Sequence, residues 1–384
     1  MSSSSLRLAL LLALTGCGGH SPAPTAEREA APVLTASASP APQQPVLAAI
    51  SSPRPPPVAP PAPPPVAAPE PTTPPGLTPL TAEQRATLRA GAEDPLTPTP
   101  IHYMKSNEVR HDVWFPYIAD KGGALFGVGS DQNYTLAAVA RSEYVFLADI
   151  DQSVVDLHNN YEVLIEASPD PASLVEKFQA ANADAALALL TTAYADLPEP
   201  ERRRRLRLYR NARETVRIHL ERVLKRKQDG EPTTWLSDPA MYDHVRALFQ
   251  ADRVRPMAGN LVGPSALQSA AAAAKALGTT FRVVYLSNAE EYFMYTPQFV
   301  ANIEALPAEE GTVVLRTIYS KEWIHADQLW AYQVQPIADF KSRFGRNSGR
   351  NSMLIRVASD GTLNKDTGTK GLSLISMPVA PASK

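Results

Sequence analysis

Short apolar runs alternate with helical patterns from residue 124 onward. The runs at 124–128 and 144–150 enclose a helical pattern at 133–140, and an alanine-rich helical segment lies at 265–277. Runs of this length separated by helices predict an α/β fold with a doubly wound, mostly parallel sheet, whose ligand site lies at the carboxyl ends of the strands. The segments expected to contain its strands are 124–128, 144–150, 253–264, 282–287, 312–319, 329–334 and 353–357.

Two further helical regions lie outside this alternation. The segment after Thr81 has the pattern of a helix that begins at this residue and carries Glu83 in its first turn. Residues 165–250 form a predicted helical insertion, with a long helix over Glu199–Lys227. One face of that helix is expected to pack inward, because apolar residues recur at helical spacing: Leu206, Tyr209, Val216, Leu220 and Val223.

The amino terminus has the pattern of a bacterial lipoprotein signal. Arg7 precedes a short apolar run, which at this length is a targeting segment rather than a membrane helix. The four residues that end at Cys17, Leu-Thr-Gly-Cys, resemble the lipobox. We therefore predict a signal peptide over 1–16 and a cell-envelope protein anchored in the membrane through acylated Cys17. Gly18 rather than aspartate follows the cysteine, which favours the outer membrane; an ordinary secretory signal with an accidental cysteine is the alternative.

Residues 17–80 are predicted to form a proline-rich tether behind Cys17. Of the 37 prolines in the chain, 20 lie between residues 22 and 79. Proline fixes φ and removes a backbone donor, so such a segment builds no packed core and favours polyproline II, a semi-rigid spacer. A ligand for a proline-binding module is the alternative. The folded domain is expected to span 81–384.

Composition excludes several kinds of chemistry. A net charge of −2 argues against binding of nucleic acid through the overall charge. A single cysteine permits neither an intrachain disulfide nor a cysteine-based metal site. The sequence has no HExxH helix, no phosphate loop and no G-x-S-x-G motif. We predict no metal and no nucleic-acid partner.

The most informative segment joins the first two predicted strands. Gly127-Val128-Gly129 ends the first strand, a helix follows, and the second strand leads to Asp149, 22 residues after Gly127. This is half of a nucleotide-binding unit: glycines permit close backbone approach, the helix amino terminus offers N–H groups, and the acid accepts hydrogen bonds from ribose hydroxyls. Gln132 stands where the dinucleotide fingerprint has its third glycine, which argues against NAD or FAD. A structural turn without a ligand is the alternative.

These segments resemble a known family. At GVGSDQNYTLAAVA, FLADID and VVYLSNAEEYF the chain resembles a family of bacterial proteins with a fold like that of class I S-adenosylmethionine-dependent methyltransferases, some of them lipoproteins. The strand end Leu286-Ser287-Asn288 is also similar to betaine-lipid aminocarboxypropyl transferases, which use S-adenosylmethionine. The resemblance covers roughly residues 100–335, and it implies that S-adenosylmethionine is the cofactor.

The resemblance also implies roles for residues of the first two strands. Gly127 and Gly129 would contact the methionine part of the cofactor, and Asp149 would hold the ribose. Asp131 is a further candidate contact to the cofactor, unless its side chain only caps the helix that follows.

Two asparagines complete the predicted site. Asn260 would lie near the adenine, where related enzymes often carry an aspartate, so this departure weakens adenine recognition. Asn288 would stand where many methyltransferases place a catalytic or substrate-binding polar residue, and it is the candidate catalytic residue.

Three functions stay open from the sequence. The first is an S-adenosylmethionine-dependent transferase, and the second is a non-catalytic exported protein that uses the same pocket for another small ligand, since S-adenosylmethionine is a cytoplasmic metabolite. The third is an envelope interaction protein, because residues 199–227 hold 12 basic residues against 4 acidic ones. A patch for anionic lipid headgroups and a solvated helix face both explain that charge. The arginines that would meet the lipid are Arg202, Arg203, Arg204 and Arg205.

Overall fold

The computed structural model describes residues 77–96, 103–319 and 321–380. The predicted signal peptide, Cys17 and the tether up to residue 76 lie outside the described residues. Leu77 and Leu80, which the tether prediction included, are buried in the folded body, so packing begins before residue 81. In the part of the chain that is described, no helix is both long enough and apolar enough to cross a membrane.

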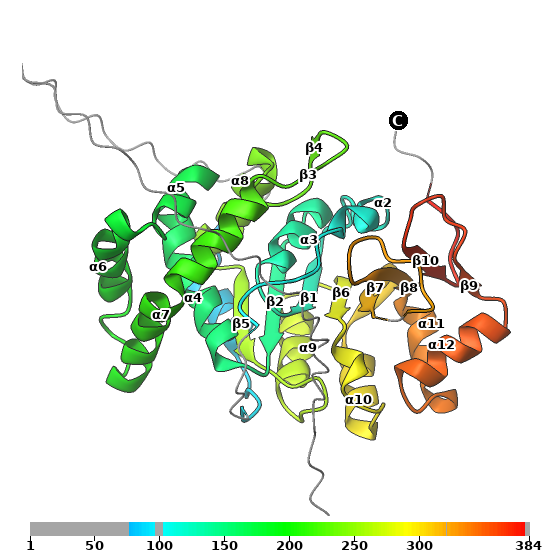
Figure 1. The fold of residues 1–384 in the computed structure, drawn as a ribbon. Helices are drawn as coiled ribbons and strands as arrows, with labels where there is room; N and C mark the ends of the chain where they lie inside the picture. The colour runs from blue at the N-terminus through cyan, green and yellow to red at the C-terminus, as the bar shows by residue number, and fades with distance from the viewer. Residues whose placement is uncertain (1–76, 97–102, 320, 381–384) are drawn as a thin grey trace, which may run out of the picture. The chain divides into compact units, whose positions relative to one another are not determined.

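The body is built on an eight-stranded sheet (Figure 1). Its strands are β1 (Ala124–Val128), β2 (Tyr144–Asp149), β5 (Val254–Ala258), β6 (Phe281–Ser287), β7 (Ala308–Ile318), β8 (Ala331–Pro336), β9 (Leu363–Asn364) and β10 (Leu372–Ile375). They lie in the order β5-β2-β1-β6-β7-β8-β10-β9. The first five in this order are parallel, β8 runs antiparallel to β7, and β9 runs antiparallel to β10. The predicted α/β fold with a mostly parallel sheet is confirmed.

Helices cover both faces of the sheet, because successive side chains of a strand point to opposite faces. Leu125 and Leu147 belong to one apolar cluster, whereas Phe126 and Phe146 belong to the other. The first cluster includes residues of α2 (Phe115–Ile118), α3 (Gln132–Ala140), α4 (Gln152–Glu166), α5 (Pro171–Glu176), α6 (Ala183–Ala193), α7 (Glu199–Leu224) and α8 (Pro239–Gln250). The second includes residues of α1 (Ala82–Arg89), α9 (Ala266–Ala276), α10 (Pro297–Ala305), α11 (Ile337–Ser342) and α12 (Arg350–Ser359).

Two of the helices match their predictions closely. The Thr81 side chain accepts a hydrogen bond from the backbone N–H of Gln84 at 3.2 Å and caps α1. The long predicted helix is α7, which lies within the predicted insertion together with α5, α6, α8 and the small hairpin of β3 (Lys227–Gln228) and β4 (Glu231–Pro232). All five apolar residues expected to face inward on α7 are buried.

The strand predicted at 353–357 is wrong, because this segment lies within α12. Met353 and Val357 are buried one turn apart, whereas Ile355 between them is 71% exposed. A short apolar run is equally consistent with a strand and with the buried face of a helix. The last two strands of the sheet, β9 and β10, come from segments that the apolar pattern did not mark.

Candidate functional site

The strand order brings several loops to one edge of the sheet. β5, β2, β1 and β6 are parallel neighbours, so their carboxyl ends share that edge. The chain order of the strands reverses at β1, and sheets of this kind bind ligands outside the carboxyl ends at such a point. Gly129, Asp149, Asn260 and Asn288 all end or follow these four strands. The fold therefore places the predicted positions on a common edge.

Side chains of α3, the helix that follows β1, pack against the glycine loop between them. Gly129 has φ +84°, which glycine adopts without strain. A Cβ on Gly127 would lie only 1.8 Å from Asn133 Oδ1. A Cβ on Gly129 would lie 2.6 Å from Gln132 Nε2. The side chains of α3 thus fill the space beside both glycines, and Gly127 permits α3 to pack against β1.

Asp149 lies beside this loop at the end of β2. Its Oδ1 accepts a hydrogen bond from the backbone N–H of Asp151 at 2.8 Å. Burial raises the pKa of Asp149 to about 6, and the charge of Asp151 adds to this, whereas backbone N–H groups, including that of Gly129, oppose it. Ile150, the next residue, is 48% exposed. The fold therefore brings the Gly129 backbone and the Asp149 carboxylate together, and the exposed apolar side chain of Ile150 follows Asp149 in the chain.

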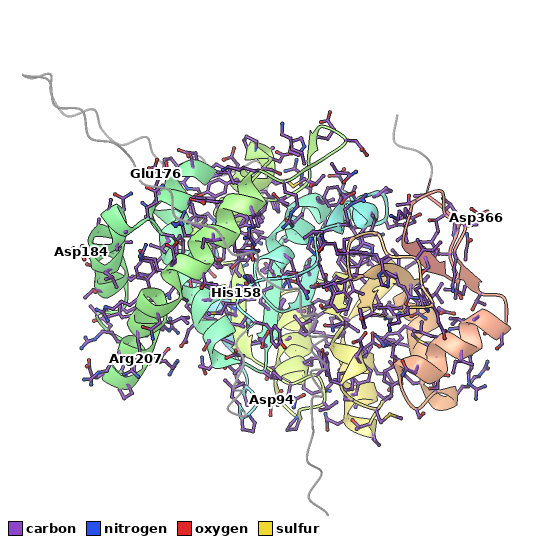
Figure 2. All side chains as sticks on the ribbon, viewed as in Figure 1. Asp94, His158, Glu176, Asp184, Arg207 and Asp366 are labelled. Carbon is purple, nitrogen blue, oxygen red and sulfur yellow. The ribbon has the colours of Figure 1, made fainter. Side chains whose placement is uncertain are left out.

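His158 of α4 holds the glycine loop in place. Its Nε2 lies 2.8 Å from the carbonyl oxygen of Gly129, and its Nδ1 lies 2.6 Å from the hydroxyl of Tyr134. A carbonyl oxygen only accepts, so Nε2 carries the proton and Nδ1 accepts from the hydroxyl. Burial lowers the pKa of His158 to about 4, so the ring is neutral at pH 7. His158, labelled in Figure 2, is buried in the interior of the body.

Asp131 belongs to a buried polar cluster. Its carboxylate accepts hydrogen bonds from His219 at 2.7 Å and from the indole N–H of Trp235 at 3.2 Å. Burial alone would raise the pKa of Asp131, but His219 and Trp235 hold it below its usual value. The side chain makes no capping bond to α3. These residues line a small cavity of about 10 Å³, which has room for about one water molecule.

A second acid–histidine pair faces the same cavity. The buried carboxylate of Glu108 lies 3.2 Å from His111 Nε2. It also accepts three hydroxyl hydrogen bonds of 2.5–2.8 Å, from Tyr285, Ser287 and Thr317. Burial alone would raise the pKa of Glu108, but His111 and the hydroxyls of Ser287 and Tyr285 hold it below its usual value.

Glu108 is part of a segment, the strap (Met104–His111), that crosses the carboxyl edge. The hydroxyl of Ser130 donates to the carbonyl of Met104 at 2.9 Å, which ties the strap to the loop after β1. Backbone N–H groups of Val109 and Arg110 donate to the hydroxyl of Tyr332 on β8. With the bonds of Glu108, the strap is attached at β1, β6, β7 and β8. Sequence reasoning missed its residues, because they precede the first strand and no spacing relates them to it.

The two asparagines of the predicted site are engaged in local turns. Asn260 Oδ1 accepts from the backbone N–H of Val262 at 3.1 Å. The amide of Asn288 donates to Glu291 at 3.4 Å and to Tyr292 at 3.3 Å. Bonds as long as the last two are weak, so Asn288 is more easily turned toward a ligand than Asn260. Among the residues described, no group of His, Cys, Asp and Glu is arranged to hold a metal ion.

Comparison with known proteins gives a family. The rRNA methyltransferase aviRa from Streptomyces viridochromogenes is similar to this chain at 14% identity over 63% of this chain and 83% of that chain, with a TM-score of 0.25. With so low a TM-score, we draw nothing from this similarity. No curated protein sequence matches the chain. A family described as "Domain of unknown function (DUF7790)" matches residues 103–376, and the chain belongs to that family.

Proposed function

We propose that the folded domain binds a nucleoside-type ligand at the carboxyl edge of β1 and β2, and that a lipid anchor at Cys17 holds this site at the cell envelope. The observation that carries the proposal is the Asp149 carboxylate, which is partly exposed at the end of β2 and lies beside the Gly129 backbone. A carboxylate at the end of the second strand accepts hydrogen bonds from ribose hydroxyls. The exposed side chain of Ile150 offers an apolar surface to a purine.

The two halves of S-adenosylmethionine fit this edge differently. The nucleoside half fits Asp149 and Ile150 for the reasons above. The methionine half does not fit, because the Gln132 side chain occupies the space beside the glycine loop and the strap is bonded to Ser130 and Ser287. We therefore derive no methyl transfer, and we treat S-adenosylmethionine, S-adenosylhomocysteine and adenosine as the first ligands to test.

Calorimetry on the full chain tests ligand binding, and mass spectrometry of the denatured protein tests whether a nucleoside copurifies. We expect heat from adenosine and from S-adenosylhomocysteine with a Kd of about 1 mM or tighter. If neither these ligands nor S-adenosylmethionine gives heat at millimolar concentration, and no nucleoside is released, the proposal is wrong.

The anchor is proposed from the lipobox-like residues and the proline-rich tether. Several acyl chains on one cysteine give stable membrane binding, whereas a single chain does not. We expect Cys17→Ser to move the protein from the membrane fraction to the soluble fraction, and labelling with an alkyne fatty acid to be lost in the same variant. An unchanged membrane fraction and unchanged labelling would contradict the anchor and leave the ligand site untouched.

Contact between α7 and anionic lipid is proposed as a second interaction. The four arginines predicted for it form ion pairs with acidic residues of the chain, so little of their charge is free: Arg202 and Arg203 with Glu199, Arg204 with Asp156, and Arg205 with Glu201. Arg207 and Arg210, on the same helix, are exposed. If α7 meets a membrane, these two residues supply more of the attraction than the predicted four.

A further inference from the structure

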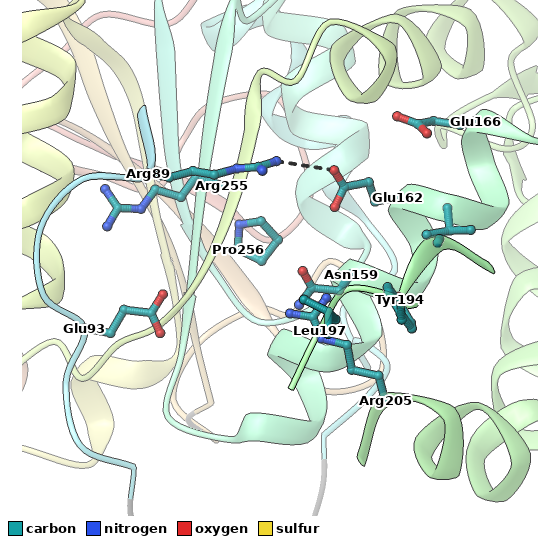
Figure 3. Close-up of a pocket in the computed structure, with 12 residues that line it drawn as sticks. Arg89, Glu93, Asn159, Glu162, Glu166, Tyr194, Leu197, Arg205, Arg255 and Pro256 are labelled. Carbon is teal, nitrogen blue, oxygen red and sulfur yellow. Dashed lines mark hydrogen bonds and ion pairs between the residues drawn. The ribbon is translucent and has the colours of Figure 1, made fainter. Parts of the chain in front are cut away.

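A pocket separate from the carboxyl edge lies beside the outer strand β5 (Figure 3). It has a volume of about 460 Å³, within the range of small-molecule sites. Its walls come from the end of α1 and the residues after it, the second half of α4, the end of α6 and the segment between α6 and α7, Arg205 of α7, and β5 itself. Pro256, in the middle of β5, has no backbone N–H to offer at this edge.

Arg255 brings a buried positive charge to the pocket. It is only 3% exposed, and among the residues described its guanidinium has one hydrogen-bond partner, the carbonyl of Leu88 at 2.9 Å from Nη1. Burial lowers the pKa of Arg255, against the opposing charge of Glu93. A guanidinium has five N–H donors, and burying it with few partners costs free energy. This wall of the pocket favours an anionic group.

Glu162 and Glu166 bring two carboxylates, one turn apart on α4. Arg89 lies 3.5 Å from Glu162, a long ion pair with a mostly exposed arginine. The charge of Arg205 also acts on Glu162, but Arg205 forms its own ion pair with Glu201. Like charges four residues apart on a helix repel each other. Burial and the charge of Glu162 raise the pKa of Glu166 to about 7. This wall favours a cationic group, and Figure 3 shows it on the other side of Pro256 from Glu93.

We propose that this pocket binds a short peptide with free termini, whose carboxylate meets Arg255 and whose ammonium group meets Glu162 and Glu166. A zwitterion can pair its carboxylate with Arg255 and its ammonium group with Glu162 and Glu166, whereas a simple anion or cation can pair with only one of these walls. Apolar side chains that line the pocket, those of Val163 and Leu197 among them, would accommodate a small peptide side chain. This site is independent of the nucleoside site.

Calorimetry with the dipeptide L-alanyl-L-leucine tests this proposal. We expect a Kd of about 1 mM or tighter. N-acetyl-L-alanyl-L-leucine and L-alanyl-L-leucinamide each lack one charge and should bind at least about 10-fold more weakly, because each leaves one wall without its partner. No heat from the dipeptide at about 10 mM, or equal affinity for the blocked peptides, overturns the proposal.

Variants locate the binding within the chain. Glu166→Gln keeps the size of an exposed side chain and should weaken dipeptide binding about 5- to 10-fold. Glu176→Gln, an exposed residue of α5 outside the pocket (Figure 2), should leave the affinity unchanged. Unchanged affinity in Glu166→Gln, or an equal loss in both variants, contradicts recognition by the α4 carboxylates.

Discussion

Two carboxylates at the carboxyl edge of the sheet differ in how well they are satisfied. Glu108 accepts hydrogen bonds from three hydroxyls and lies next to His111, and His111 and the hydroxyls of Ser287 and Tyr285 hold its pKa below the usual value. Asp149 has fewer partners, and burial raises its pKa to about 6. Both residues lie at the carboxyl edge of the same sheet, Asp149 at the end of β2 and Glu108 in the strap that crosses this edge, and they differ in the partners that surround them.

This difference in partners indicates that Glu108 has a structural role and that Asp149 is the candidate for ligand binding. A buried charge with a full set of partners stabilises one conformation and has little capacity left for a ligand. A charge with too few partners destabilises the fold and gains from a ligand that supplies the missing hydrogen bonds. By this criterion, the part of the carboxyl edge that the strap covers is structural, and the part at the end of β2, around Asp149, is the candidate binding site.

The largest expected effect is on the structural acid. Glu108→Ala leaves three hydroxyls and His111 without their common partner, so we expect the free energy of unfolding to fall by about 3–5 kcal/mol. Urea denaturation measures this change. Glu108→Gln retains part of the hydrogen bonding and should lose less. A loss below about 1 kcal/mol in Glu108→Ala would mean that the strap is not held by this residue.

The next effect concerns the histidine under the glycine loop. His158→Phe keeps an aromatic ring but removes both hydrogen bonds, and it leaves the carbonyl of Gly129 and the hydroxyl of Tyr134 without these partners. We expect a loss of about 1–3 kcal/mol in the free energy of unfolding and weaker adenosine binding, because the loop is no longer fixed. Full affinity for adenosine in a folded His158→Phe protein would show that the loop position does not matter.

Asp149→Asn should act in the opposite direction on stability. The pKa of Asp149 in the folded chain lies above its ordinary value, so the stability that protonation of this group contributes is lost as the pH rises through about 6. Removing the charge should therefore raise the free energy of unfolding by about 1–2 kcal/mol at pH 7.5 and have little effect at pH 4. Thermal unfolding at the two pH values measures this difference. A destabilised Asp149→Asn protein at pH 7.5 would place Asp149 with Glu108 among the structural acids.

The smallest expected effect is on membrane contact. Arg207→Ser should reduce binding to vesicles that contain anionic phosphatidylglycerol by about fivefold at low salt, since one basic residue near the surface contributes about 1 kcal/mol. Lys370→Ser, at an exposed residue between β9 and β10, is the control. Equal binding by both variants would remove α7 from the membrane contact.

The sequence predicts what lies within one local unit. Gly129 and Asp149 belong to a single strand–helix–strand unit, so their contact follows from the glycine turn and the length of the helix between the strands. The helical insertion and the inward face of α7 are predictable for the same reason, because helical spacing is a local property.

Contacts that depend on strand order are not predictable from the sequence. Glu108 meets Ser287 and Thr317 across 179 and 209 positions of the chain. Those contacts exist only because β6 and β7 are neighbours in the sheet and the strap lies across both of them. The pocket beside β5 likewise combines α1, α4 and the insertion, which no motif connects.

The most direct test of the central claim compares adenosine with 2′,3′-dideoxyadenosine, which lacks the ribose hydroxyls that Asp149 is proposed to bind. In calorimetry at pH 7.5, we predict that the wild-type chain binds adenosine at least about 10-fold more tightly. The preference should shrink at pH 5, where Asp149 is largely protonated, and should be lost in Asp149→Asn. Equal affinity for the two nucleosides in the wild-type chain at pH 7.5 would contradict the nucleoside site.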